Sequence, residues 1–381
     1  MTVEEIIAAA SAQTGLSDIG DPAVLEGLRR LLVAFAGEAR FTERGLAMAH
    51  ADLVTYMANR MRIEGWLKDH PELLAAPVEK PLFVFGLPRT GTTLVINLLA
   101  ADPARRSFLR WEAYDPIPPA RPEELHAGPR FEAMQAKCLM ALEHVPHIAA
   151  IHMEYADSPT ECQFLMTPSF TAQVHEALAD IPSWRHWFLH EADYRPAFRF
   201  HKRWLQVLQH YAKGRWTLKN PWHPLFLDAL TETYPDAQLV MTHRDPAEVV
   251  GSCCSLIRYS RQIYSDDVDL KGIGESFMDT FRIMIDRADA FKAKHGADAI
   301  HDVQYADTLR DPIGTVRRIY ERFDEPFTPE AQAAMHAYMA DNRQGKHGKH
   351  SYDLAEYGLS KDAVHERFRD YIERYDIPVK A

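Results

Sequence analysis

The stretch Leu82-Phe83-Val84-Phe85-Gly86-Leu87-Pro88-Arg89-Thr90-Gly91-Thr92-Thr93 decides the fold of this chain. Residues 82–86 form a short apolar run that ends in glycine, which is typical of a buried strand. The apolar residues that follow, from Thr92 to Leu99, have the composition of a buried helix. A strand, a glycine-containing loop and a helix in succession predict the first unit of an α/β fold.

The loop between this strand and this helix has the spacing of the phosphate-binding Walker A sequence GxxxxGK[ST], but Thr92 replaces its lysine. Gly86 and Gly91 permit a tight backbone, so that N–H groups at the helix N-terminus can cradle a phosphate. Thr92 and Thr93 add hydroxyl donors, and Arg89 must supply the positive charge. This suits a 5′-phosphate bearing a transferable group of low charge, for which a metal ion is less necessary. The alternative is a tight turn with a chance pair of glycines.

Further strand and helix patterns alternate along the chain after this loop. Strand-like runs occupy 216–219, 237–242 and 299–305, and helical patterns separate them at 223–234, 246–260, 273–294 and 312–323. This alternation predicts an α/β domain with a P-loop-like central parallel sheet flanked by helices. Ligands of such sheets bind at the carboxyl ends of the strands.

The residues before the first strand have a different composition. Residues 1–75 are rich in Ala, Leu, Met and Glu, as in 21–36 and 42–68, and predict helices. A proline-flanked linker over 76–80 follows. We therefore expect an N-terminal helical extension over 1–75 and an α/β domain over 76–381. The extension could cap an acceptor pocket or form a homodimer contact, and the sequence leaves both open.

Composition limits the classes of partner. The net charge is −11, which disfavours nucleic-acid binding because that binding needs a strong positive field. The four cysteines include no CxxC pair, and neither a signal peptide nor a transmembrane run is visible. These features predict a cytoplasmic protein without a structural zinc site.

A second motif ends the strand at 237–242 and opens the next helix. Asp245 and Pro246 are suited to the cap and the first turn of that helix, which places Arg244 at the carboxyl end of the strand. Ser252 follows eight residues after Arg244. A guanidinium and a hydroxyl suit a terminal phosphate. A structural salt bridge for Arg244 is the alternative, and a Walker B magnesium role for Asp245 is less favoured than capping.

A third motif is the basic run at 342–350, in which Arg343, Gly345 and Lys346 combine charge with a flexible backbone. It can wrap around an anion, or it can be a solvated surface loop.

Together these motifs resemble the sulfotransferase family that uses 3′-phosphoadenosine 5′-phosphosulfate (PAPS). Residues 88–93 resemble the family's 5′-phosphosulfate loop, with Arg89 where many members have lysine and where tyrosylprotein and many bacterial members have arginine. The segment from Arg244 to Ser252 resembles its 3′-phosphate motif, RDPxxxxxS. The resemblance runs from about Pro81 to Gly358.

The resemblance implies a role for each motif. Arg89, Thr90, Gly91, Thr92 and Thr93 would bind the 5′ side of PAPS. The 3′-phosphate would be bound by Arg244 and Ser252, and from the basic run by Arg343, Gly345 and Lys346. Lys219, at a strand end, would contact the transferred sulfonate or the bridging oxygen, and Arg89 would stabilise the leaving group. No metal is expected.

Two residues are candidates for the general base that an alcohol acceptor needs. Glu112 lies 23 residues after Arg89 and beside Trp111, where its pKa could be raised; some Arg-loop sulfotransferases use a glutamate at this distance. His223 is the second candidate, because the segment from Lys219 resembles the family's Lys-Thr-His sequence with one inserted residue. A surface ion pair for Glu112 and a helix cap for His223 are the alternatives.

The acceptor is less well defined. The region 164–204 is rich in aromatic residues and Met, which suits either an apolar acceptor cavity or plain core packing. His152, Glu154 and Glu161 could line this pocket or support the fold. His186 and His190 are four residues apart, but no HExxH sequence completes a metal motif.

We therefore predict transfer of a sulfonate from PAPS to the hydroxyl of a small or lipid-like acceptor, which gives a sulfate ester and PAP. The alternatives are a P-loop kinase or NTPase that uses Mg²⁺ and ATP, and a non-catalytic nucleotide-binding protein. Thr92 and the pairing of Arg244 with Ser252 argue against the first.

Overall fold

A five-stranded parallel sheet forms the centre of the protein in the computed structural model, which describes residues 1–144, 154–342 and 351–379. The strand order is β2-β3-β1-β4-β5. The strands are β1 (Leu82–Gly86), β2 (Arg105–Ser107), β3 (Arg215–Lys219), β4 (Gln238–His243) and β5 (His301–Gln304). The predicted α/β class and four of these strands are confirmed, whereas the sequence did not indicate β2.

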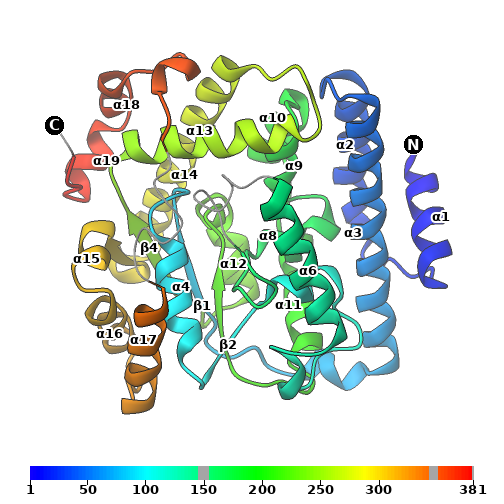
Figure 1. Cartoon of the computed structure of the whole chain (residues 1–381), viewed down its shortest axis with the longest axis horizontal. Helices are drawn as coiled ribbons and strands as arrows, with labels where there is room; N and C mark the ends of the chain where they lie inside the picture. Colours follow the sequence, from blue (N-terminus) through cyan, green and yellow to red (C-terminus); the bar gives the residue numbers. More distant parts are fainter. Residues whose placement is uncertain (145–153, 343–350, 380–381) are drawn as a thin grey trace.

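Alternate residues of β1 face opposite layers of helices, as the two-residue period of a strand requires. Leu82 and Val84 pack in one cluster with α4 (Thr92–Ala101), α16 (Pro312–Arg322) and α17 (Pro329–Asp341). Phe83 and Phe85 belong to the larger core on the other face. That core is covered by α11 (Arg195–Leu208), α12 (Leu227–Thr233), α13 (Pro246–Gln262) and α14 (Leu270–His295). Figure 1 shows the sheet between these layers.

The remaining helices surround the carboxyl ends of the strands and the rim of the molecule. They are α5 (Arg110–Tyr114), α6 (Pro129–His144), α8 (Gln163–Met166), α9 (Val174–Leu178), α10 (Pro182–His190), α15 (Tyr305–Arg310), α18 (Lys361–Arg367) and α19 (Arg369–Arg374). Within the described ranges, no helix combines the length and the apolar character needed to cross a bilayer.

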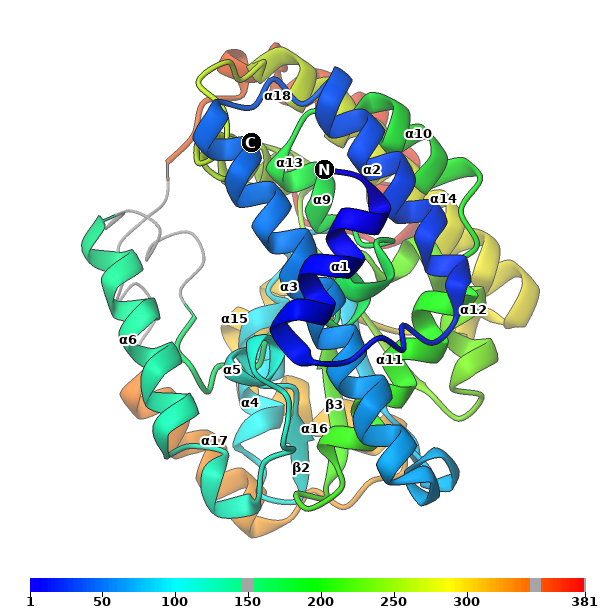
Figure 2. The same cartoon turned by 90° about the vertical axis from the view of Figure 1, so that its right-hand side faces the viewer.

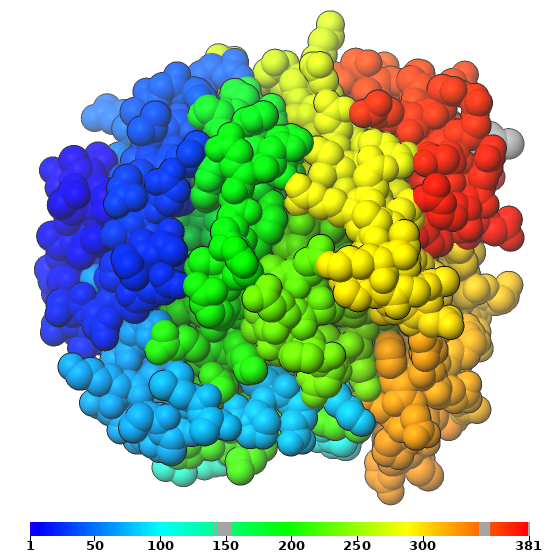
Figure 3. All heavy atoms as spheres, turned by 180° about the vertical axis from the view of Figure 1, so that it is seen from behind, coloured from blue at the N-terminus to red at the C-terminus, as the bar shows by residue number. Residues whose placement is uncertain are grey.

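The N-terminal helices α1 (Val3–Thr14), α2 (Leu25–Gly37) and α3 (Glu43–Asp69) match the predicted helical segment. In Figure 2, α1 lies across α3 in front of the body. Figure 3 shows them in blue beside the green α10–α11 segment, which α2 and α3 contact. Buried side chains of this segment and of the α/β region form one contiguous core. The boundary at 75/76 stays a prediction.

The register of the sheet brings two sequence motifs to one edge. Gly86 at the end of β1 is level with Thr242 in β4, so the loop after β1 and Arg244 leave the sheet together. Asp245 caps α13 by accepting a hydrogen bond from the Ala247 N–H at 2.9 Å. This is the predicted capping role, and His365 Nε2 lies 2.8 Å from the same carboxylate.

Candidate functional site

The loop Gly86–Thr93, called the glycine turn below, needs glycine at positions 86 and 91 for steric reasons. Gly86 has φ 147° and Gly91 has φ 92°, a region that L side chains rarely adopt. A Cβ at Gly86 would collide with the carbonyl oxygen of Thr242, and a Cβ at Gly91 would lie 2.6 Å from the Tyr305 ring. Gly91 is the N-cap of α4, and no side chain caps this end. The first N–H groups of α4 are therefore suited to an anion.

The last four residues of the glycine turn, Thr90 to Thr93, have two different roles. The Thr90 hydroxyl donates to the Leu87 carbonyl at 2.7 Å and lies 2.6 Å from the Thr242 hydroxyl. Thr90 is buried and its side chain holds the turn against β4. Gly91, Thr92 and Thr93 instead line a cavity. Any contact of Thr90 with a ligand would therefore come from its backbone.

Arg89 connects the glycine turn to the second motif. Its backbone is left-handed, with φ 70°. Its Nε donates to the Ser252 hydroxyl at 3.1 Å, and its carbonyl oxygen accepts from Arg244 Nη1 at 2.8 Å. Burial, and next the neighbouring Arg244, lower the pKa of the Arg89 guanidinium. The motifs that lie far apart in sequence thus form one positively charged cluster.

Arg244 is held by three groups at once. Besides the Arg89 carbonyl, it pairs with Glu248 at 3.0 Å, and its guanidinium lies over the Tyr305 ring at 4.4 Å. Such a fixed guanidinium loses little conformational freedom when it binds a phosphate. Arg244 also lines the same cavity as the glycine turn.

This cavity has a volume of about 920 Å³ and a lining of two kinds. We call its charged lining residues the charged wall, and they include Arg89, Arg105, Arg106, Arg110, Glu154, Asp157, Glu161 and Arg244. We call its apolar lining residues the apolar wall, and they include Leu109, Phe164, Val174, Ala177, Leu178, Trp222, Leu256 and Ile257. A ligand with a phosphate-bearing end and an apolar partner matches these walls.

Most of the aromatic residues of 164–204 that could have lined an acceptor cavity lie in the core instead. Phe164 lines it, whereas Met166, Phe170, Trp184, Phe188 and Trp204 are fully buried in the core. For those residues the alternative of plain core packing holds. Within the described residues, His186 and His190 gain no third metal ligand. His152 lies outside the described residues.

Lys219 ends β3 and does not itself line the cavity, but its partner Glu161 does. Its Nζ lies 3.1 Å from Glu161 Oε1, and both residues are nearly inaccessible to solvent. Glu161 lines the cavity and is also held by Gln163. The pair therefore places a cation and a carboxylate at the carboxyl end of the sheet, next to the glycine turn.

Glu112 does not line the cavity. Its side chain is fully buried on α5, where one carboxylate oxygen pairs with Arg106 and the other accepts from the Leu109 N–H at 3.1 Å. It is neither the surface ion pair nor the cavity-facing acid considered from sequence. It holds Arg106, which does line the cavity.

His223 also lies behind the wall. Its ring packs edge-on against Phe83 and Phe226, it is fully buried, and burial lowers its pKa well below the usual value. The helix that follows begins with His223 itself, so His223 is not its N-cap. An apolar enclosure of this kind keeps the imidazole neutral but gives it no access to a cavity ligand.

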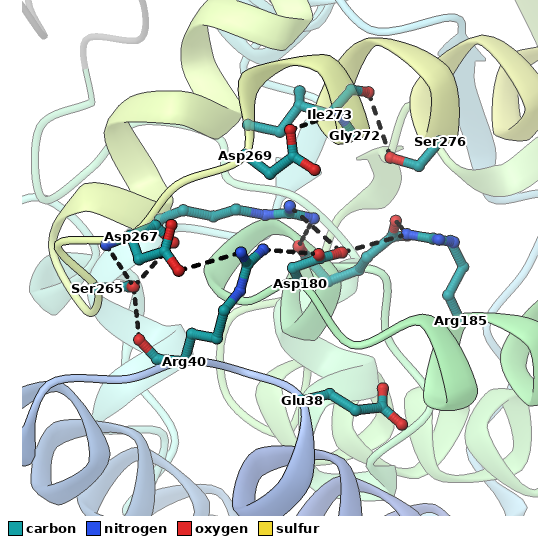
Figure 4. Close-up of polar contacts among 12 residues, drawn as sticks. Glu38, Arg40, Asp180, Arg185, Ser265, Asp267, Asp269, Gly272, Ile273 and Ser276 are labelled. Atoms are coloured by element: carbon teal, nitrogen blue, oxygen red, sulfur yellow. Dashed lines mark hydrogen bonds and ion pairs between the residues drawn. The ribbon is translucent and has the colours of Figure 1, made fainter.

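A partly buried charge cluster contacts α9, which contributes to the apolar wall. It comprises Arg40, Glu176, Asp180, Arg185 and Arg261, and we call it the Asp180 cluster. Figure 4 shows Arg40, Asp180 and Arg185 of this cluster. Glu176 Oε1 accepts from Arg185 at 3.1 Å, and the Glu176 carbonyl accepts from Arg261 at 3.1 Å. Asp180 lies 3.1 Å from Arg40 and 3.6 Å from Arg261. Glu176 belongs to α9, whose Val174, Ala177 and Leu178 face the cavity.

Three predicted site residues, Arg343, Gly345 and Lys346, lie outside the described residues. Beyond that segment, Tyr352 donates to the Glu248 carbonyl at 3.1 Å, and burial raises its pKa to about 12. The chain thus returns to α13 close to Arg244.

Sequence reasoning missed three residues of the cavity wall. Arg106 and Arg110 were not singled out, because β2, which contains Arg106 and precedes Arg110, was not recognised. Tyr305 follows β5 directly. The rule that ligands bind at carboxyl strand ends could have found Tyr305, since its strand was predicted.

The arrangement matches known proteins in sequence and in fold. A sequence model of the sulfotransferase family matches residues 81–329. Sulfotransferase STF9 from Mycobacterium avium has a TM-score of 0.94 and 34% identity, covering 100% of this chain and 98% of that chain. Sulfotransferase STF1 from Mycobacterium tuberculosis H37Rv has a TM-score of 0.86 and 35% identity, and the match covers 97% of this chain and 99% of that chain.

A further relative is omega-hydroxy-beta-dihydromenaquinone-9 sulfotransferase Stf3 from Mycobacterium tuberculosis. It is 25% identical over 314 residues, which cover 78% of this chain and 75% of that protein. The family match spans the sheet, the glycine turn and the Arg244 motif. This chain therefore belongs to the sulfotransferase family.

Proposed function

We propose that this sulfotransferase uses PAPS as its donor and the hydroxyl of a hydrophobic, lipid-like molecule as its acceptor. The single observation that carries the proposal is the continuity of the cavity. Arg89, Arg244 and the N-terminus of α4 form its charged wall, and an apolar wall from α8, α9 and α13 faces the same space. The relative that acts on a hydroxylated menaquinone supports a lipid-like acceptor.

In this proposal the donor lies between the two arginine motifs. The glycine turn, through Arg89 and the N–H groups of residues 91–93, binds the 5′-phosphate, and Arg244 with Ser252 binds the 3′-phosphate. The hydrogen bond between Arg89 and Ser252 supports one shared ligand. Arg343, Gly345 and Lys346 stay predictions for the same phosphate.

The transfer itself needs charge stabilisation and a base. The acceptor oxygen forms a bond to sulfur while the bond from sulfur to the 5′-phosphate oxygen breaks, and PAP leaves. We propose that Lys219 contacts the sulfonate and that Arg89 stabilises the leaving phosphate. These cations replace the metal ion of related phosphoryl transfers, so we expect activity without added metal.

For the general base we propose Glu161 in place of Glu112 and His223. A base must reach the acceptor hydroxyl directly or through one water. Glu161 lines the cavity 3.1 Å from Lys219, whereas Glu112 and His223 lie behind the wall. The acceptor proton would pass to the Glu161 carboxylate as the new bond forms.

The predictions about partners, location and oligomeric state remain part of the proposal. The net charge of −11 is unfavourable for a nucleic-acid partner. A cytoplasmic location and a homodimer stay predictions from the sequence. Family membership does not favour the alternative of an ATP-dependent kinase.

The test combines binding and turnover. Calorimetry should show binding of PAP but not of ATP with Mg²⁺, and purified enzyme should release PAP from PAPS with long-chain isoprenoid alcohols faster than with short alcohols. Arg244→Lys should weaken PAP binding by about tenfold, because lysine lacks the forked donors. Binding of ATP in preference to PAP, or equal turnover of short and long alcohols, would contradict the donor or the acceptor assignment respectively.

A further inference from the structure

A cluster of metal-ligating side chains lies where α3 ends, away from the cavity. It consists of His70, Glu72 and His210, and none of the three lines the cavity. His70 is the C-cap of α3, and Pro71 then starts a short 3₁₀ helix that contains Glu72. His210 follows the end of α11. The cluster therefore joins two segments that are far apart in the sequence.

Local hydrogen bonds fix each segment, and Gln206 of α11 joins the two by donating to the Leu74 and Ala76 carbonyls at 3.0 and 2.9 Å. The His70 N–H donates to the Trp66 carbonyl at 2.9 Å, and the His210 N–H donates to the Val207 carbonyl at 3.0 Å. His70 Nδ1 lies 3.4 Å from Glu72 Oε1. One ligand atom from each of the three residues lies within 4.8 Å of the others.

Aromatic rings hold both imidazoles in place. Trp66 stacks on His70 with ring centroids 4.7 Å apart, and Tyr211 stacks on His210 at 4.1 Å. The two imidazole rings are 5.0 Å apart. This packing limits the rotamers of two ligands before any metal binds, which reduces the entropy cost of forming a site.

We propose that His70, Glu72 and His210 bind a zinc ion, with water as the fourth ligand. Two imidazoles and a carboxylate with an open position are a ligand set that zinc takes. Zinc–ligand distances of about 2.0–2.2 Å put tetrahedral ligands about 3.4 Å apart. His70 and Glu72 already have this spacing, and the Glu72 side chain is 64% exposed and free of packing constraints. Small rotations of the side chains complete the site.

The contact between Trp66 and His210 makes zinc binding detectable by tryptophan fluorescence. Trp66 Nε1 donates to His210 Nδ1 at the long distance of 3.4 Å. A metal at Nδ1 replaces this contact, and a metal at Nε2 places a proton on Nδ1, which then cannot accept. Zinc binding at either nitrogen therefore changes the environment of the Trp66 indole.

The bound ion would tie the end of the N-terminal helices to α11. Zinc that binds the folded state and not the unfolded state raises the melting temperature in a concentration-dependent way. The effect does not depend on the proposed transfer reaction, because the cluster contributes no residue to the cavity.

The test uses untagged full-length protein stripped of metal. Zinc titration by calorimetry should show one equivalent bound, and zinc should raise the melting temperature. His70→Gln and His210→Gln should each weaken binding by at least about tenfold, because each removes one of three ligands. The matched control is His186→Gln with His190→Gln, which removes a surface pair without a third described ligand and should leave the affinity unchanged.

Nickel quenching of tryptophan fluorescence is the second measurement, and it does not depend on stability. Trp66→Phe should remove most of the quenching, since Trp66 stacks on His70 and donates to His210. Absence of zinc binding to the wild-type protein would overturn the proposal. Unchanged affinity in both cluster variants, or loss of affinity in the His186 and His190 control, would also overturn it.

Discussion

Glu161 is a carboxylate that the fold brings into the cavity beside a buried cation. Its partner Lys219 is 1% exposed and lies 3.1 Å away, so the two charges compensate each other in a site that excludes water. When a sulfonate attracts Lys219, the carboxylate is released to accept a proton. The pair thus links donor binding to activation of the acceptor in the proposed mechanism.

Glu161→Gln should lower turnover by about 10²-fold or more, because an amide of the same shape cannot take the acceptor proton. PAP affinity should change little. The measurement is PAP release at saturating substrates, with PAP binding by calorimetry beside it. Weakened PAP binding would instead indicate a displaced Lys219 and contradict the base role.

Glu112→Gln is the comparison that decides between the two carboxylates. Glu112 is fully buried with Arg106, so the substitution leaves a buried guanidinium without its charge partner and should lower the melting temperature. Unchanged stability with loss of turnover in Glu112→Gln, together with an active Glu161→Gln, would return the base role to Glu112.

Spacing along the sequence could not decide this point. Glu112 follows Arg89 at a suitable separation and next to a tryptophan, and those features were visible in the sequence. Which side of the wall a side chain faces depends on Arg106, a residue of a strand that was not predicted. The glycine turn and Arg244 were predictable because their roles depend on backbone geometry that local sequence specifies.

At the scale of elements, β2 shows why the sheet was only partly predictable. It has three residues, two of them arginines, and such a segment lacks the apolar pattern of a strand. Its Arg105 is buried because distant groups compensate it: Arg105 donates to the Tyr320 hydroxyl at 2.8 Å and pairs with Glu325. The local sequence gives no sign of partners that lie so far along the chain. The apolar run of β1, in contrast, is enough to predict a buried strand.

The short helix α9 is the element on which acceptor binding should depend. Glu176 anchors it through Arg185 and Arg261, and burial raises the pKa of the Glu176 carboxyl. Glu176→Gln should raise the KM for the acceptor by about tenfold, equivalent to about 1.4 kcal/mol. The KM for PAPS and kcat should change little, because the charged wall is made by other elements.

Arg40→Ala is the matched control for this element. Arg40 is the exposed end of the Asp180 cluster, with a side chain that is 39% exposed, and exposed ion pairs contribute little. Its acceptor KM should stay close to that of the wild-type enzyme. Equal changes in the KM values of donor and acceptor in Glu176→Gln would indicate a general loss of structure and contradict a positioning role for α9.

At the scale of the whole molecule, one core connects the N-terminal helices, the sheet and the helices above it. Among the described residues, four histidines are fully buried in that core or at its edge, namely His175, His201, His223 and His243. Burial lowers the pKa of His175 to about 3 and that of His201 to about 3, and it lowers the pKa of His223 well below 6.5. The folded protein therefore keeps these rings neutral in mildly acidic solution.

These shifts give the stability a definite dependence on pH. Each pKa is lower in the folded state than in the unfolded state, so below about pH 6.5 the unfolded chain binds more protons. The free energy of unfolding is then highest above that pH and falls as the solution is acidified. Each buried histidine contributes up to about 1.4 kcal/mol per pH unit to this slope.

His201→Gln isolates the contribution of one ring. The glutamine amide can still contact the Tyr234 hydroxyl, which lies 2.7 Å from His201 Nδ1, but it does not titrate. Urea unfolding between about pH 7.5 and 5 should show a slope that is shallower by nearly one proton, whatever the absolute stability of the variant. Glu176, whose raised pKa acts in the opposite direction, is present in both proteins and cancels in the comparison. An identical slope in the wild-type protein and the variant would mean that His201 takes up its proton inside the folded core, and that the core admits water where the packing indicates none.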